Sequence, residues 1–174
     1  MRHSCDHQAG FTLLEILVIV VIVGILAAII APSWLQFFAN RQVEAARAEI
    51  DQGIRQAQTQ AIARRATWQF TIREQGDQVE WAIHPQAIAV DNISLWQTFD
   101  PKITVDWQNT TDSDQEQIYT IAFDFKGTVE AQSIVTVEDR ADIARKRCVL
   151  INNLLGRTSK GEELSVPRRG LECF

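Results

Sequence analysis

The sequence has 174 residues, of which 46% are hydrophobic, and a formal net charge of -5 at pH 7. This length allows one folded domain of about 110 residues beyond an N-terminal apolar segment. The acidic balance argues against a general nucleic-acid-binding protein, which normally shows a concentrated basic face.

The first predicted element is a long apolar helix that follows a short polar leader. Residues 1–10 form the leader, and residues 11–31 form an apolar run that contains a single carboxylate, Glu15. A run of about 20 apolar residues is long enough to cross a bilayer as a helix. A carboxylate inside such a helix is costly, so it is usually paired, close to a helix end, or functional.

The leader differs from an ordinary secretory signal in the position of its small residues. A secretory signal carries them after its apolar region, which is then discarded. Here Ala9-Gly10 precedes the apolar run. Cleavage after Gly10 would therefore keep the helix and expose a new amino group on Phe11, one helical turn from Glu15.

The segment 10–15, Gly-Phe-Thr-Leu-Leu-Glu, resembles the start of type IV prepilins and type II secretion pseudopilins. The long apolar run with Gly24 and Pro32 and the amphipathic helix after it continue the match. The resemblance implies that a prepilin peptidase cleaves after Gly10 and methylates the Phe11 amine. It also implies that Glu15 meets the amine of a neighbouring subunit during filament assembly. The alternative is a signal-anchor helix whose Glu15 is solvated near the lipid headgroups.

The apolar helix is expected to continue into an amphipathic one. Residues 11–38 form the transmembrane and assembly segment, in which Gly24 and Pro32 allow a kink, and residues 39–66 form the amphipathic segment. One stripe of the latter should face the globular domain: Val43, Ala46, Ile50, Ile54, Ala57 and Ala61. The other side carries Arg41, Glu44, Arg47, Asp51 and Arg55, with Glu44–Arg47 and Asp51–Arg55 spaced to interact.

Alternating polar and apolar residues predict a β-rich globular domain over residues 67–174. A hairpin is expected around the turn residues 75–78, and Pro85 ends it. Further strands are expected at residues 87–90, 93–99, 103–107, 118–125, 128–137 and 147–151. The predicted fold class is α+β, with a long N-terminal transmembrane and amphipathic helix packed on a mostly antiparallel β-sheet.

The C-terminal half carries a second resemblance. Residues 121–128 and 147–151, with Gly156-Arg157, are similar to the H-type minor pseudopilins and their minor-pilin relatives. The chain continues past this element through Lys160-Gly161 to a longer tail, which leaves open a more specialised minor pilin.

The cysteines predict a disulfide near the C-terminus. Cys5 lies in the leader, so the mature chain holds Cys148 and Cys173, an even pair in a domain expected outside the cytoplasm. We predict that they are bridged, and the resemblance supports this because many pilins close a C-terminal loop in this way. The alternative is two free thiols. The tail between them shows little strand pattern.

Catalytic, metal and nucleic-acid sites find little support in the sequence. His84 has no nearby nucleophile motif, so no catalytic residue and no cofactor are expected. The acidic run 112–116 could bind calcium, but a solvated loop is the favoured interpretation. Three basic clusters, at 64–65, 145–147 and 168–169, could bind DNA, but solvated faces are favoured over a phosphate-binding patch.

The sequence therefore predicts a structural protein and not an enzyme. It is expected to be a minor subunit of a type IV pilus or a type II secretion pseudopilus, serving pilus biogenesis or protein secretion. Its expected partners are other pilin or pseudopilin subunits, prepilin peptidase, an inner-membrane assembly platform, and membrane lipid before assembly. It should cross the inner membrane once, with a periplasmic C-terminal domain, and enter a filament. The alternative is an adhesive or DNA-binding minor pilin.

Overall fold

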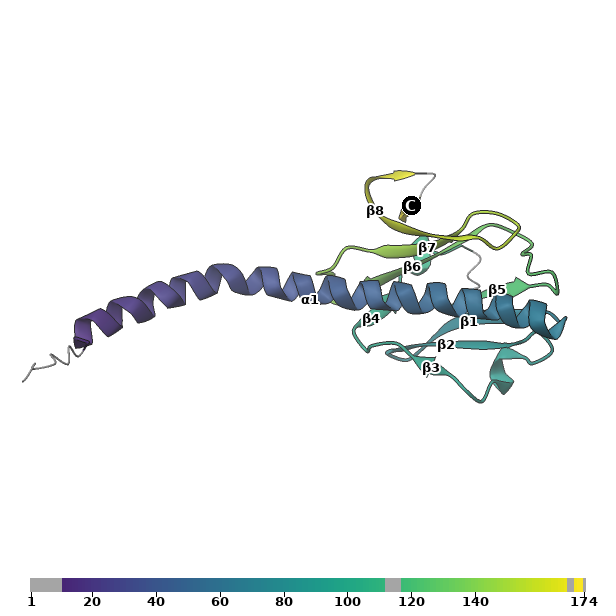
Figure 1. The fold of residues 1–174 in the computed structure, drawn as a ribbon, viewed down its shortest axis with the longest axis horizontal. Helices are drawn as coiled ribbons and strands as arrows, with labels where there is room; N and C mark the ends of the chain where they lie inside the picture. The colour runs from purple at the N-terminus through teal and green to yellow at the C-terminus, as the bar shows by residue number, and fades with distance from the viewer. Residues whose placement is uncertain (1–10, 112–116, 169–170, 174) are drawn as a thin grey trace, which may run out of the picture. The chain divides into compact units, whose positions relative to one another are not determined.

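The computed structural model describes residues 11–111, 117–168 and 171–173. It divides into two compact units, Met1–Gln36 and Phe37–Phe174. Helix α1 (Leu13–Arg64) contributes to both units, and all β-strands belong to the second (Figure 1). The expected α+β class, a long apolar N-terminal helix and antiparallel sheets, is confirmed.

The first unit is helical from Leu13 onward. Thr12 caps the helix, because its Oγ1 accepts a hydrogen bond from the backbone N–H of Glu15 at 3.3 Å. By length and composition α1 is able to cross a membrane, and no residue of its most apolar window is buried. The helix continues through Gly24 and Pro32, and a kink at these residues stays a prediction.

In the second unit, the expected stripe of α1 is buried. All six of its residues, from Val43 to Ala61, lie in the core. The ion pairs Glu44–Arg47 and Asp51–Arg55 also form as their spacing predicted.

Arg47 and Asp51, on the side opposite the stripe that was expected to face the domain, also lie inside the domain. Both are buried because strand β8 (Thr158–Arg168) covers this side of α1. Arg47 Nη1 donates to the carbonyl oxygen of Gly161 at 3.0 Å, and Thr158 Oγ1 donates to Asp51 Oδ1 at 2.7 Å. The helix therefore uses polar side chains to bind a strand beside its apolar stripe.

The helix ends at Arg64, two residues before the expected limit of 66. Arg65 adopts a left-handed conformation with φ of 52°, and the backbone N–H of Ala66 bonds to the carbonyl of Ala61. This arrangement is typical of a helix C-terminus.

The first sheet contains the predicted hairpin. Strands β1 (Trp68–Gln75) and β2 (Gln78–Pro85) pair around a turn in which Gly76 has φ of 64°. β3 (Gln97–Thr98) and β5 (Ile118–Phe123) complete the antiparallel order β3-β2-β1-β5. The strand expected at 87–90 is wrong, because the chain turns after Pro85 and forms the 3-10 helix η1 (Val90–Asn92).

The second sheet has strands that the sequence pattern did not indicate. Its antiparallel order is β4-β6-β7-β8-β9, with β4 (Ile103–Val105), β6 (Ser133–Asp139) and β7 (Arg147–Ile151). β8 and β9 (Leu171–Cys173) occupy the tail that appeared to have little strand pattern. Residues 158–163 of β8 are polar apart from Gly161, whose carbonyl oxygen accepts the bond from Arg47.

The core lies where the C-terminal half of α1 crosses the two sheets (Figure 1). Gly53 marks a close approach, because a Cβ built there would lie 2.4 Å from Cε2 of Phe70 on β1. The buried residues that share this core include Phe70, Ile72, Tyr119 and Phe123 of the first sheet and Val135, Val137, Val149 and Ile151 of the second.

Replacing Gly53 with Ala should destabilise the second unit. The added methyl forces the Phe70 ring to move, which costs about 1–3 kcal/mol, and the better helix propensity of Ala returns only about 1 kcal/mol. Urea unfolding of the detergent-solubilised full chain, followed by tryptophan fluorescence, measures the difference. The control Gln52→Ala changes an exposed neighbour and should stay within about 0.5 kcal/mol of the parent. A Gly53→Ala protein as stable as its control would contradict the close helix–sheet contact.

Candidate functional site

The N-terminal candidate residues lie on an exposed apolar helix. Phe11 and Glu15 are both exposed, and Glu15 lies in the first turn of α1. The residues around it are apolar and exposed as far as Ile30. Gly10 lies outside the described residues, so cleavage after Gly10 and methylation of Phe11 stay predictions.

The exposed segment cannot remain in water as it stands. No described residue covers the side chains from Leu13 to Ile30, and contiguous apolar surface of this kind marks a membrane or protein contact. Glu15 is its one charged residue between Leu13 and Ile30. A helix of this composition requires lipid or other helices around it, and a partner or water at the carboxylate.

The second candidate site lies at the end of the chain. Cys148 and Cys173 form the disulfide that the sequence predicted, and both are buried. The bond joins β7 to β9, the two strands on either side of β8. β9 has only three residues, so the disulfide supplies much of its attachment.

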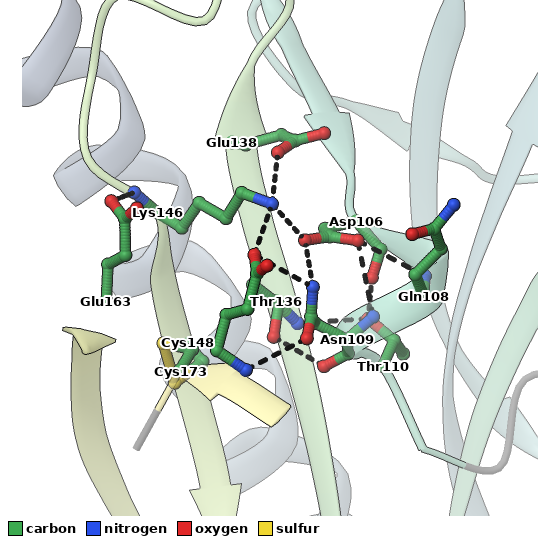
Figure 2. Close-up of polar contacts among 11 residues, drawn as sticks. Asp106, Gln108, Asn109, Thr110, Thr136, Glu138, Lys146, Cys148, Glu163 and Cys173 are labelled. Atoms are coloured by element: carbon green, nitrogen blue, oxygen red, sulfur yellow. Dashed lines mark hydrogen bonds and ion pairs between the residues drawn. A yellow bond between two sulfur atoms is a disulfide. The ribbon is translucent and has the colours of Figure 1, made fainter. Parts of the chain in front are cut away.

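A cluster of polar side chains lies beside the disulfide (Figure 2). Lys146 Nζ is 2.7 Å from Asp106 Oδ2, 3.3 Å from Glu138 Oε2 and 3.0 Å from Glu172 Oε2. We call these four residues, with Asn109, the Lys146 cluster. One ammonium therefore faces three carboxylates that come from separate elements of the chain.

Asp106 and Asn109 connect the Lys146 cluster to the backbone. Asp106 caps the 3-10 helix η2 (Trp107–Asn109), and its Oδ1 accepts bonds from the backbone N–H groups of Gln108 and Asn109. Asn109 Nδ2 donates to Asp106 Oδ2 at 2.7 Å, while Asn109 Oδ1 accepts from the backbone N–H of Glu172 at 2.9 Å. Thr136 Oγ1 donates to the carbonyl of Asn109, which adds β6 to the network.

The pKa values of the cluster follow from burial and from the single ammonium. Burial alone would raise the pKa of Asp106, but hydrogen bonds from Lys146 and Asn109 outweigh it and lower that pKa. Burial raises the pKa of Glu138, with a contribution from the Asp106 charge, although Lys146 opposes the change. Burial would lower the pKa of Lys146, but hydrogen bonds to Asp106 and Glu172 and nearby negative charge raise it.

This arrangement attaches the C-terminal strand to the domain. Glu172 and Cys173 are neighbours on β9, and one side chain is bound by Lys146 while the other is bound covalently by Cys148. No sequence signal indicated these contacts, because Lys146 and Glu172 are far along the chain from each other and from the segment that holds Asp106 and Asn109. The only local indication was the pair of cysteines.

The basic cluster at 145–147 does not form the free patch that a DNA-binding surface would need. Lys146 is bound by three carboxylates, and Arg147 pairs with Glu44 and Glu162 at 3.6 and 3.5 Å. At the other two clusters, the Arg64 guanidinium lies 5.2 Å from the centre of the Trp68 ring, and the side chains of 168–169 lie outside the described residues.

His84 is a buried structural residue. Its Nε2 lies 3.0 Å from Thr71 Oγ1 and its Nδ1 lies 3.0 Å from the carbonyl oxygen of Pro85. A pocket at the neighbouring sheet edge is lined by Gln69, Gln86 and Ser133, and Glu130 is the one carboxylate among its lining residues. With one carboxylate in its lining, this pocket does not offer the pair of acids that a two-carboxylate acid–base mechanism uses. The acidic run 112–116 lies outside the described residues.

Comparisons with known proteins match a sequence motif near the N-terminus and the fold. Residues 5–31 match the family model described as the prokaryotic N-terminal methylation motif. The fold is similar to that of the type IV minor pilin FimU of Pseudomonas aeruginosa (strain PAO1), in two crystal forms. A search of curated protein sequences found no match.

The structural likeness extends over most of both chains. The P21 crystal form gives a TM-score of 0.52 at 13% identity and covers 71% of this chain and 90% of FimU. The P65 form gives 0.50 at 13% identity and covers 67% and 90%. At this identity the likeness is one of fold.

Replacing Lys146 with Met should destabilise the domain most at neutral pH. Three carboxylates then repel one another, at a cost of about 1–3 kcal/mol, less than for a fully buried pair because the Lys146 side chain keeps 19% exposure. Urea unfolding of the full chain between pH 4.5 and 7.5 measures this, with the exposed Lys102→Met as control.

The pH dependence has a definite sign. In the parent, the lowered pKa of Asp106 contributes stability above its unfolded value of 3.8, which is lost as the pH falls through the folded value. The raised pKa of Lys146 contributes stability that is present below 10.5 and lost only in more alkaline solution. Without Lys146, the carboxylates bind protons more readily, so the deficit of the variant should shrink toward pH 4.5. A deficit that is constant with pH would contradict the charge argument.

Removing the disulfide should cost about 3 kcal/mol of unfolding free energy. The pair closes a loop with a sequence separation of 25 residues, for which the chain-entropy estimate is about 3 kcal/mol. The double variant Cys148→Ser/Cys173→Ser should therefore unfold at lower urea, and backbone amides of β9 should exchange faster with deuterium. The parent treated with reductant is the matched control and should behave like the variant. Equal stability of oxidised parent and variant would show that the Lys146 cluster alone attaches β9.

Proposed function

We propose that this chain, which is prepilin-like in its N-terminal motif and pilin-like in its fold, is a minor structural subunit of a type IV pilus or a type II secretion pseudopilus. In this role a prepilin peptidase cleaves it after Gly10 and methylates Phe11. An inner-membrane assembly platform then transfers its apolar helix from lipid into a filament. The role is structural and requires no catalysis.

The observation that carries the proposal is Glu15 on an exposed apolar helix. A carboxylate at the centre of a membrane helix costs about 2.5–3.5 kcal/mol. Opposite charges about 4 Å apart attract by about 4 kcal/mol where the effective dielectric constant is about 20. Pairing of Glu15 with the Phe11 amine of a neighbouring subunit therefore offsets the cost of both charges and sets the register of the two helices.

The apolar side chains around Glu15 support the same role. They are exposed along the helix as far as Ile30. Lipid covers such a surface before assembly, and neighbouring helices can replace the lipid in a filament, since helix association in apolar surroundings depends on packing and polar pairs. The proposed location is accordingly the inner membrane, with a periplasmic C-terminal domain, followed by the filament.

The globular domain supports a position as a minor component. Its likeness to FimU, a type IV minor pilin, is one of fold and extends over most of that chain. We infer that other pilin or pseudopilin subunits are its partners in protein secretion or pilus biogenesis. The disulfide fits an oxidising compartment such as the periplasm.

The charge at Glu15 tests this role. In cells that assemble the filament, Glu15→Gln should leave the protein inserted in the membrane but reduce its recovery in sheared filaments at least tenfold, because the carboxylate no longer pairs with an amine. Immunoblotting of the membrane and filament fractions measures both amounts. Glu130→Gln, an exposed residue of the globular domain, is the control and should assemble normally.

Mass spectrometry of the same samples tests processing. The mature chain should begin at a methylated Phe11, and cells without prepilin peptidase should accumulate a chain that begins at Met1. Normal assembly of Glu15→Gln, or an unprocessed chain in cells with active peptidase, would overturn the proposed role.

A further inference from the structure

Four large apolar side chains are exposed together at the end of the domain where α1 terminates. Ile62 is 51% exposed, Phe125 55%, Leu154 56% and Leu155 70%. They come from the last turns of α1, the loop after β5, and the loop between β7 and β8 (Figure 1). We call this set the Phe125 patch.

Hydrogen bonds hold the three segments of the Phe125 patch together. Gln58 Nε2, one turn before Ile62, donates to the carbonyl oxygens of Gly127 and Leu155 at 2.8 and 2.9 Å. The backbone N–H of Val129 donates to the carbonyl oxygen of Leu154 at 2.9 Å. One side chain of the helix therefore joins both loops.

Close backbone packing shows that the two loops are seated on the helix. A Cβ built on Gly127 would lie 2.7 Å from Cδ1 of Ile62, and one on Gly156 would lie 2.8 Å from Nε2 of Gln58, so both loops approach α1 closely. Both glycines also have positive φ, at 79° and 69°. The exposed apolar residues thus belong to a packed surface, which lowers the entropy lost when a partner binds.

Basic residues border the Phe125 patch. Lys126 Nζ lies 5.4 Å from the centre of the Phe125 ring, Arg157 follows two residues after Leu155, and Arg65 follows three residues after Ile62. All three are exposed. The carboxylate of the loop, Asp124, accepts backbone bonds from Thr128 and Lys126, chiefly the first, and these lower its pKa. Asp124 is therefore negative, but the three basic residues outnumber it, and the border carries a net positive charge.

We propose that the Phe125 patch docks a different subunit of the same filament, through a surface that is apolar at its centre and carries carboxylates around it. The inference rests on the proposed function. The basic border complements a partner surface that carries carboxylates, and it disfavours a second copy facing this patch in two-fold symmetry, which would place Lys126 and Arg157 against their own counterparts. Three of the four patch residues are aliphatic and offer no ring on which a nucleic-acid base could stack.

Photo-crosslinking in filament-forming cells tests the proposal. The full chain carries a photoreactive amino acid at Leu155, and the expected adduct joins it to another polypeptide with a prepilin-type N-terminus, as identified by mass spectrometry. Lys126→Glu/Arg157→Glu should reduce this adduct at least fivefold, because the border then repels carboxylates. Lys102→Glu, exposed on another part of the domain, should leave the adduct unchanged.

Two further probes separate this inference from the proposed function. A photoreactive residue at Leu26 on the apolar helix reports assembly, and one at Leu95, which is 83% exposed, reports random contact. Crosslinks from Leu26 without crosslinks from Leu155 would overturn the docking surface and leave the proposed function intact. Crosslinks from neither position would count against both. An adduct of two identical chains, of lipid or of DNA at Leu155, or an equal adduct at Leu95, would also overturn the docking surface.

Discussion

Burial of one stripe of α1 against two β-sheets is the interaction on which the rest of the domain depends. Val43, Ile50 and Ile54 are fully buried in a core that both sheets share. Each such side chain contributes about 1.5–3 kcal/mol when it leaves water. The two sheets are separate, and side chains of α1 pack in the core that both share. The site residues near the C-terminus are therefore positioned by a sheet that the helix helps to complete.

The apolar side chains of α1 are covered by the domain in one part of the helix and exposed in the other. From Val43 to Ala61 its apolar side chains are covered by the domain, whereas from Leu13 to Ile30 the apolar side chains are exposed. The polar residues follow this division. Arg47 and Asp51 bind β8 within the domain, while Glu15 has neighbours that offer it no charge. The globular domain therefore buries its own apolar side chains, whereas the N-terminal segment needs lipid or other helices to cover its apolar side chains.

The features that the sequence predicted are those set by local spacing. The buried stripe follows from a period of three to four residues, the hairpin from alternation around Gly76, and the disulfide from an even pair of cysteines. The features it missed depend on contacts between distant segments. β8 was missed because its residues 158–163 are polar apart from Gly161, and they bind the polar side chains Arg47 and Asp51 of α1. The three carboxylates that bind Lys146 come from three separate segments, so the run 145–147 resembled a solvated basic cluster in the sequence.

The strand order gives the disulfide a mechanical role. Cys148 on β7 and Cys173 on β9 lie on opposite sides of β8, so the covalent bond encloses that strand. Tension applied along the backbone passes through the sulfur atoms and bypasses the residues between them. The cysteines are 25 residues apart in the sequence. While the bond is oxidised, the segment between them, about 90 Å long when fully extended, cannot be stretched by a force on the chain. The oxidised bond therefore protects β8, the strand that binds α1 through Arg47 and Asp51, from being pulled out by a load across these two cysteines.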